Sequence, residues 1–361
     1  MRWMAALLCL ASSAPAGTID TVAGTGRRES GGDGGPATAC PLREPFHVDL
    51  DGRGRLLIAD AADHKIRRVD LVTGIIATVA GDGQPGSAGD GGPAVQAQVH
   101  SPYAVVAAED DAVFVVEQLG RAVRRVDGRS GRIERVAGTG GRGAEGDGGP
   151  ALVATFREPN DIHPDGRGGL LVADVADWRV RRVDLGTGLI APFAGSGRLN
   201  RPPDRSRVGD GGPAREATVV GARAVCGDGK GNVYLCEREG NAIRKVDAAG
   251  IITTVAGTGA AGYSGDGGPA LAATFRGPKG VRCDRLGNVY VVDTENHAIR
   301  RVDVATGLIS TVAGGHQGPD GDGGQATRAG LDRPHGCVVA PDGTLYIADS
   351  DNHRVRRVKF P

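Results

Sequence analysis

A six-residue motif recurs six times along this chain and constrains its fold more than any other feature. The first copy is GDGGPA at Gly32–Ala37, and the last is GDGGQA at Gly321–Ala326. Successive copies begin 57, 57, 63, 56 and 56 residues apart. The aspartates of the six copies are Asp33, Asp90, Asp147, Asp210, Asp266 and Asp322. Recurrence at a nearly constant period, here 56–63 residues, is typical of repeat architectures such as propellers.

The sequence that follows each copy of the motif predicts a unit of four short strands. In the fifth unit we expect strands at Gly280–Cys283, Val289–Asp293, Ala298–Asp303 and Leu308–Gly314, separated by turns. The sixth unit stops after its third strand, and the missing fourth strand matches GTIDTVAG at Gly17–Gly24. We therefore predict an all-β fold, a six-bladed β-propeller of four-stranded antiparallel blades whose N-terminal strand closes the last blade.

Two segments of these units match each other closely, LGNVYVVDTENHAIRRV at Leu286–Val302 and DGTLYIADSDNHRVRRV at Asp342–Val358. Both resemble NHL repeats, and the resemblance extends over residues 17–361. Gly120-Arg121 replaces the Asn-His pair in the second unit and Gly240-Asn241 replaces it in the fourth, so these copies are divergent. The resemblance implies a propeller but no particular function, because propellers carry many activities.

The first 16 residues have the pattern of a secretory signal peptide. Arg2 precedes an apolar stretch at Met4–Ala11, and Ala14-Pro15-Ala16 fits a cleavage site. We therefore expect a signal peptide at residues 1–16, a propeller domain at residues 17–361, and a secreted, periplasmic or extracellular location. No later stretch reaches about 18 apolar residues, so no membrane span is expected.

The charge balance disfavours a nucleic-acid partner, and the cysteine spacing disfavours a disulfide framework. The 43 Lys and Arg residues balance 43 Asp and Glu residues, and aromatic residues are only 4%, which disfavours a nucleic-acid partner. Five cysteines follow residue 16 at scattered positions, unlike a disulfide framework. Cys226 and Cys236 are expected on one hairpin, where either a strained disulfide or two buried thiols fits.

Residues that recur in every unit are expected to serve the blade. An acid ends each second strand, and an arginine follows seven residues later, so each pair is expected to face across two strands as a structural ion pair. The pairs are Asp60 and Arg67, Glu117 and Arg124, Asp174 and Arg181, Glu237 and Arg244, Asp293 and Arg300, and Asp349 and Arg356.

The GDGGPA motif itself is predicted to be a connector between blades. Its aspartate is expected to cap a tight turn, and its proline to start one or two helical turns pinned by an apolar residue. A calcium site needs more oxygen ligands than most copies offer, and a phosphate loop needs a Lys-Ser/Thr that does not follow.

Residues that differ between units are better candidates for function. One position, directly after a recurring proline, is expected to start the innermost strand and face the mouth of the central channel. Its six residues are Phe46, Tyr103, Asn160, Arg223, Lys279 and His335, with His47 and Asp161 next to two of them. We predict that these eight residues bind a ligand at the channel mouth, and we predict no catalytic residue.

Two enzyme families have features that part of this ring matches. PHG at Pro334–Gly336 resembles the zinc-binding strand start of peptidyl-hydroxyglycine amidating lyases, which implies a histidine in three alternate blades. Here those places hold Tyr103, Arg223 and His335. A lactonase-like metal site would need Glu, Asn and Asp, of which only Asn160 and Asp161 are present. We therefore predict no bound metal and no cofactor.

The connector before the fourth unit is six residues longer than its siblings and rich in arginine. It holds Arg198, Arg201, Arg205 and Arg207. It fits either a partner-binding loop or a tolerated solvated insertion. Together these features predict an exported, monomeric NHL propeller that binds a protein or glycan through its loop-rich top face. The alternative is a metal-dependent propeller enzyme, a lactonase, hydrolase or lyase, with its site at the channel mouth.

Overall fold

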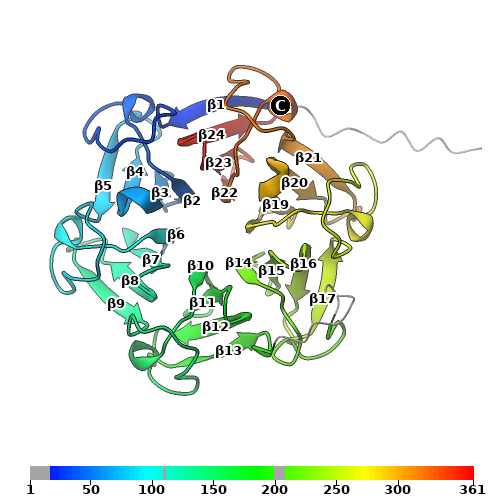
Figure 1. Ribbon diagram of the computed structural model, residues 1–361, viewed down its shortest axis with the longest axis horizontal. Helices are drawn as coiled ribbons and strands as arrows, with labels where there is room; N and C mark the ends of the chain where they lie inside the picture. The colour runs from blue at the N-terminus through cyan, green and yellow to red at the C-terminus, as the bar shows by residue number, and fades with distance from the viewer. Residues whose placement is uncertain (1–16, 109–110, 199–207) are drawn as a thin grey trace, which may run out of the picture.

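The protein forms a ring of six four-stranded antiparallel sheets, as predicted. The computed structural model describes residues 17–108, 111–198 and 208–361. The predicted signal peptide, residues 1–16, lies outside them. Figure 1 shows the six blades around a central axis, with one strand of each blade innermost and one at the periphery. Within the described residues, no helix has the length and apolar character that crossing a membrane requires.

The strands take four radial positions in the blades. The innermost strands are β2 (Pro45–Leu50), β6 (Pro102–Ala107), β10 (Pro159–Pro164), β14 (Ala222–Gly227), β18 (Gly280–Cys283) and β22 (Gly336–Val339). The second strands are β3 (Leu56–Asp60), β7 (Val113–Glu117), β11 (Gly169–Asp174), β15 (Val233–Glu237), β19 (Val289–Asp293) and β23 (Leu345–Asp349). The third strands are β4 (Lys65–Val69), β8 (Ala122–Val126), β12 (Arg179–Asp184), β16 (Ala242–Val246), β20 (Ala298–Val302) and β24 (Arg354–Lys359). The outermost strands are β5 (Ile76–Ala80), β9 (Ile133–Ala137), β13 (Ile190–Ala194), β17 (Ile252–Ala256), β21 (Ile309–Gly314) and β1 (Thr18–Ala23).

Ring closure joins the two ends of the described chain. β1 pairs antiparallel with β24, and Thr18 lies opposite Lys359. The N-terminal strand is therefore the outermost strand of the sixth blade, which confirms the predicted closure. In Figure 1 this strand is the blue arrow beside the red β24.

The hydrophobic core lies between neighbouring blades. Successive residues of a strand point to opposite faces of its sheet. Thus Leu56 and Ile58 of β3 pack towards the sixth blade, while Leu57 and Ala59 pack towards the second. Both faces of every sheet are covered in this way, which explains why apolar residues occupy consecutive positions in these strands.

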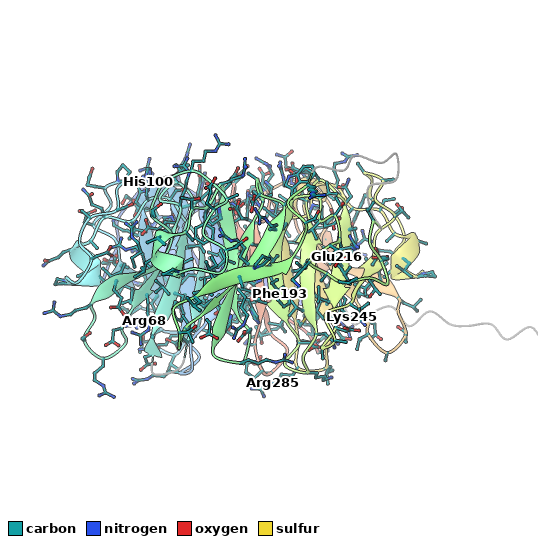
Figure 2. All side chains as sticks on the ribbon, turned by 90° about the horizontal axis from the view of Figure 1, so that it is seen from below. Arg68, His100, Phe193, Glu216, Lys245 and Arg285 are labelled. Carbon is teal, nitrogen blue, oxygen red and sulfur yellow. The ribbon has the colours of Figure 1, made fainter. Side chains whose placement is uncertain are left out.

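The direction of the innermost strands defines two ends of the propeller. We call the end where these strands begin the upper end and the end where they finish the lower end. In the side view of Figure 2, His100, just before β6, and Arg285, just after β18, lie at opposite ends of the disc. The GDGGPA connectors precede the innermost strands and therefore lead to the upper end.

The GDGGPA connectors cover the edges of the outermost strands. In the first connector, Ile76 of β5 donates its N–H to Gly35 and accepts an N–H from Gly34. Gly34 has a φ of 80°, which favours glycine. The proline precedes one 3-10 turn instead of starting a longer helix: Pro36 has φ −60° and ψ 130°. These turns are η1 (Ala37–Ala39), η3 (Ala94–Gln96), η5 (Ala151–Val153), η6 (Ala270–Ala272) and η8 (Ala326–Arg328).

The Asn-His pair of the two best-matching units forms the turn between the second and third strands. In the fifth unit the turn is η7 (Thr294–Asn296), and its counterpart in the first unit is η2 (Ala61–Asp63). His297 ends η7 in a left-handed conformation with φ 54°. The side-chain amide of Asn296 donates to Asp293 at 2.8 Å and to the carbonyl of Gly262 at 2.7 Å. The asparagine thus connects the end of the second strand to the preceding connector.

Candidate functional site

Six buried arginines hold the connectors to the blades. Each lies on a third strand, is at most 1% exposed, and contacts the aspartate of its own GDGG motif at 2.6–2.8 Å. The pairs are Arg67 with Asp33, Arg124 with Asp90, Arg181 with Asp147, Arg244 with Asp210, Arg300 with Asp266, and Arg356 with Asp322. The motif aspartate is therefore the main ion-pair partner of the arginine, a role that sequence reasoning missed. The sequence feature that could have revealed this role is the constant separation of 34 residues between the motif aspartate and the arginine.

The predicted pairing of these arginines with the acid of the second strand is present in four blades. The distances are 3.0 Å for Glu117 with Arg124, 2.8 Å for Glu237 with Arg244, 3.6 Å for Asp293 with Arg300, and 3.4 Å for Asp349 with Arg356. The two glutamates approach most closely, because their extra methylene extends the carboxylate towards the guanidinium.

In the first and third blades this prediction is wrong. Neither Asp60 and Arg67 nor Asp174 and Arg181 is among the ion pairs of the described residues. Asp60 instead accepts the backbone N–H groups of Arg43 and Glu44, at 3.0 and 2.9 Å. Asp174 likewise accepts two consecutive backbone N–H groups, at 2.7 and 2.8 Å.

The second-strand acids also predict a pH effect on stability. Burial raises the pKa of Glu237 to about 8, whereas the unfolded chain ionises glutamate near about 4.3. The folded state therefore holds an extra proton between these values. The stability that this bound proton contributes is fully present below the pKa of Glu237 in the unfolded chain. It is lost as the pH rises through the pKa of Glu237 in the folded protein.

We expect Glu237→Gln to become more stable relative to wild type as pH rises from about 5 to about 9. The change should exceed about 1.4 kcal/mol, the free energy of one pKa unit. Urea unfolding of both proteins at several pH values measures this difference. The control is Glu134→Gln, at a position whose side chain is 64% exposed. A pH-independent difference for Glu237→Gln would show that this carboxyl is ionised in the folded protein.

The predicted channel-mouth residues do converge at the upper end of the axis. All eight line one small space together. That space measures only about 10 Å³, about the minimum that one water molecule needs. Phe46 stacks on His335 with ring centroids 4.4 Å apart and lies 4.8 Å from the ring of Tyr103. The side chains thus fill the upper end of the central channel. We call the six residues at the start of the innermost strands the upper ring: Phe46, Tyr103, Asn160, Arg223, Lys279 and His335.

Two cations are buried in the upper ring. Arg223 and Lys279 are each 6% exposed. The guanidinium of Arg223 lies 4.6 Å from the ring centroid of Tyr103 and donates to its hydroxyl. The nearest carboxylate in the described part of the chain, on Glu158, is 3.9 Å away. Burial, together with the charge of Arg238, lowers the pKa of Arg223 to about 9.

The ammonium of Lys279 has one neutral and one charged neighbour. Its Nζ lies 3.1 Å from Nε2 of His335 and 3.4 Å from Glu295. His335 Nδ1 lies 2.8 Å from the carbonyl of Arg333. Nδ1 therefore donates its proton and Nε2 accepts from Lys279, as a neutral imidazole requires. Burial and the charges of Arg223 and Arg333 lower the pKa of Lys279 to about 7.

Asn160 completes the upper ring with an unpartnered amide. It is 1% exposed, and neither its Oδ1 nor its Nδ2 has a hydrogen-bond partner among the residues that the structure describes. Buried amides without partners are uncommon in folded proteins. The upper end therefore has an unpartnered amide beside two buried cations.

A buried charge cluster lies directly below the upper ring. Asp161 faces Arg282 at 3.1 Å and His47 at 3.5 Å. Burial alone would raise the pKa of Asp161, but Arg282, His47 and hydrogen bonds hold it below its usual value. Burial and Arg282 lower the pKa of His47 to about 3, so this imidazole is neutral at pH 7. Sequence reasoning missed Arg282, which lies three residues beyond Lys279 along the inner strand.

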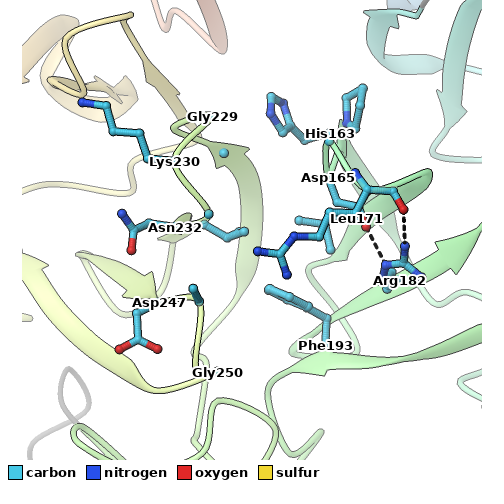
Figure 3. A pocket seen from close by; sticks show the side chains of 17 residues that line it. His163, Asp165, Leu171, Arg182, Phe193, Gly229, Lys230, Asn232, Asp247 and Gly250 are labelled. Atoms are coloured by element: carbon cyan, nitrogen blue, oxygen red, sulfur yellow. Dashed lines mark hydrogen bonds and ion pairs between the residues drawn. The ribbon is translucent and has the colours of Figure 1, made fainter.

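The larger spaces lie at the lower end. A groove of about 530 Å³ separates the turns of the third and fourth blades, and Figure 3 shows Leu171 and Phe193 along its wall opposite Lys230 and Asn232. A second cavity of about 260 Å³ lies at the lower end of the axis. The two spaces share His163, Pro164 and Gly227. His163, near the end of the inner strand β10, lines both cavities and is not among the predicted site residues.

Only one of the four arginines of the long connector lies within the described residues. Arg201, Arg205 and Arg207 lie outside the described residues, and Arg198 is exposed. Among the described residues, no three His, Cys, Asp or Glu side chains are grouped as metal ligands. The three positions that correspond to the zinc-binding histidines of the lyases hold Tyr103, Arg223 and His335. The guanidinium of Arg223 donates a hydrogen bond to the hydroxyl of Tyr103, and His335 contacts Lys279.

Comparisons with known proteins agree with the repeat pattern. A family model of the NHL repeat matches residues 275–301 and 331–358, and a model of the teneurin NHL domain matches residues 187–263. The chain is 25% identical over 349 residues to NHL repeat-containing protein 2 of Gallus gallus, which covers 88% of this chain and 46% of that protein. It spans less than half the length of the curated relatives that it matches.

Solved structures share the fold at low sequence identity. An auxiliary nutrient binding protein from Bacteroides thetaiotaomicron has a TM-score of 0.67 and 16% identity, over 95% of this chain and 76% of that one. A streptogramin B lyase has a TM-score of 0.53 and 14% identity, over 90% and 95%. The repeats, their six blades and the family matches lead to one conclusion: this chain contains NHL repeats and folds as a six-bladed β-propeller.

Proposed function

We propose that this propeller is a binding module that holds an anionic glycan against the upper end of its axis. The observation that carries the proposal is the pair of buried cations, Arg223 and Lys279, whose nearest carboxylates are 3.9 and 3.4 Å away. Burial and neighbouring positive charges disfavour both charged forms. A bound anion would stabilise both cations and accept a hydrogen bond from Asn160.

The shape of the upper ring favours a polymer that lies across it. The residual space of about 10 Å³ holds no small molecule. Phe46 is half-buried and stacked on His335, so an aromatic surface lies beside the two cations. A sugar ring with a carboxylate or sulfate can contact both kinds of group. The description of the similar Bacteroides structure as a nutrient binding protein agrees with a binding role. Export and a monomeric state remain predictions from the sequence.

Replacing both Arg223 and Lys279 with glutamine is expected to weaken binding to heparin at least about tenfold, or about 1.4 kcal/mol. The physical reason is the loss of two positive charges in a site from which water is largely excluded. Titration calorimetry at about 0.1 M salt measures the dissociation constant.

The matched control removes two cations from the lower end, Arg167 and Lys230, both exposed. We expect this variant to bind heparin like wild type. Dextran, which is uncharged, should not bind. Equal loss in both double variants would mean non-specific attraction and would overturn the proposed site. Tight binding of poly-glutamate with none of heparin would favour an acidic protein instead of a glycan.

A further inference from the structure

The lower axial cavity brings together two cysteines from neighbouring blades. Cys226 is on β14 of the fourth blade and Cys283 on β18 of the fifth. Their sulfur atoms are 3.3 Å apart. In sheet pairing, Cys226 lies opposite Tyr234, and Cys283 opposite Val289, so the sulfur contact joins two separate sheets. The hairpin partner considered from the sequence, Cys236, lies instead opposite Ala224.

The two thiols differ in their access to solvent. Cys226 is 1% exposed, whereas Cys283 is half-buried. Both line the lower axial cavity, whose volume of about 260 Å³ admits a small disulfide molecule. A reagent in this cavity therefore meets the sulfur of Cys283 next to that of Cys226.

We propose that Cys226 and Cys283 are a redox site that forms a reversible disulfide between the fourth and fifth blades, with a small-molecule disulfide as the oxidant. The thiolate of Cys283 attacks one sulfur of the oxidant, which gives a mixed disulfide and releases one thiolate. The thiolate of Cys226 then attacks the Cys283 sulfur and expels the second thiolate. Two electrons pass from the cysteines to the oxidant, and the two cysteine protons end on the two released thiols. This site is independent of the glycan site proposed above.

The surroundings set the rate of this reaction. The hydrogen bond with Cys226, followed by burial, raises the pKa of the Cys283 thiol. Because the thiolate is the attacking species, oxidation should be slow near neutral pH and faster at higher pH. Once the first adduct forms, the neighbouring sulfur makes the second step intramolecular and fast.

Treating the folded protein with cystamine at about pH 8.5 is expected to remove two free thiols. Alkylation after unfolding counts the thiols, and peptide mass mapping should find the Cys226 and Cys283 peptides linked. Dithiothreitol should reverse the link. The oxidised protein should melt several degrees higher, because the disulfide closes a loop between residues 57 positions apart.

Single variants separate the two steps. Cys226→Ser should trap a cysteamine adduct on Cys283, and Cys283→Ser should form no cross-link. The control, Cys236→Ser, removes a buried thiol of the same blade and should leave the link intact. Recovery of every thiol from the folded wild type at this pH would overturn the proposal. So would a link from Cys226 to Cys236, or a link that forms only in urea.

Discussion

Arg124→Met is expected to destabilise the protein by about 3–5 kcal/mol, the range for breaking a buried ion pair by removing one partner. Arg124 and Glu117 are both fully buried, and their charged groups are 3.0 Å apart. Arg124 also contacts Asp90 at 2.7 Å and donates to the carbonyl of Gln98 at 2.6 Å. Removal leaves the Glu117 carboxyl without its cation and detaches the second connector from its blade. Urea unfolding measures the loss.

The neighbouring Arg125 provides a matched control on the same strand. Its side chain is 31% exposed, and its carboxylate contacts are 3.3 and 3.6 Å long. Surface pairs of this kind contribute about 0–1 kcal/mol, so Arg125→Met should be nearly neutral. If the two methionine variants lose similar stability, the buried arginines do not hold the connectors to the blades.

Asp161→Asn is expected to cost a similar amount, about 3–5 kcal/mol, because it leaves Arg282 buried without a carboxylate. Arg282 is 7% exposed and contacts both oxygens of Asp161, at 3.1 and 3.2 Å. Adding Arg282→Met should restore part of the loss, so that the double variant is more stable than the sum of the single effects predicts. A coupling of about 1–3 kcal/mol is expected.

Arg182→Met is the control for the arginine substitution. Arg182 lies at the lower groove, 28% exposed, with carboxylates of Asp165 and Asp184 at 2.5 and 2.9 Å. We expect its loss to cost about 1 kcal/mol or less. Strict additivity of Asp161→Asn and Arg282→Met would show that the axial pair contributes no interaction energy.

The fold could be predicted from the sequence because each blade repeats the same local pattern. Turn residues, strand lengths and the 56–63-residue period all specify one sheet, and the sixth unit identifies the missing strand at Gly17–Gly24. The ion pairs were harder to predict. A spacing of seven residues suggested a cross-strand contact, whereas Arg300 extends past its strand to Asp266, 34 residues earlier. Local register does not show how far a long side chain extends.

The candidate site was predictable in position but not in shape. Equivalent places in six blades must converge on the axis, so the ring from Phe46 to His335 follows from the repeat alone. Whether the ring leaves a cavity depends on packing across the axis between residues far apart in sequence, such as Phe46 and His335. The same limit applies to Arg282 with Asp161, and to Cys226 with Cys283, which meet only in the assembled ring.

The pairing of β1 with β24 has a consequence for how the protein is made. The partners Thr18 and Lys359 lie near opposite ends of the described chain, so the sixth blade cannot assemble until the whole stretch from β1 to β24 is available. Contacts between residues so far apart in sequence form slowly. During synthesis β1 therefore stays unpaired until β24 has been made and the ring closes, and exposed strand edges promote association between chains. We expect the rate of ring closure, more than the stability of any single blade, to limit the yield of correctly folded protein.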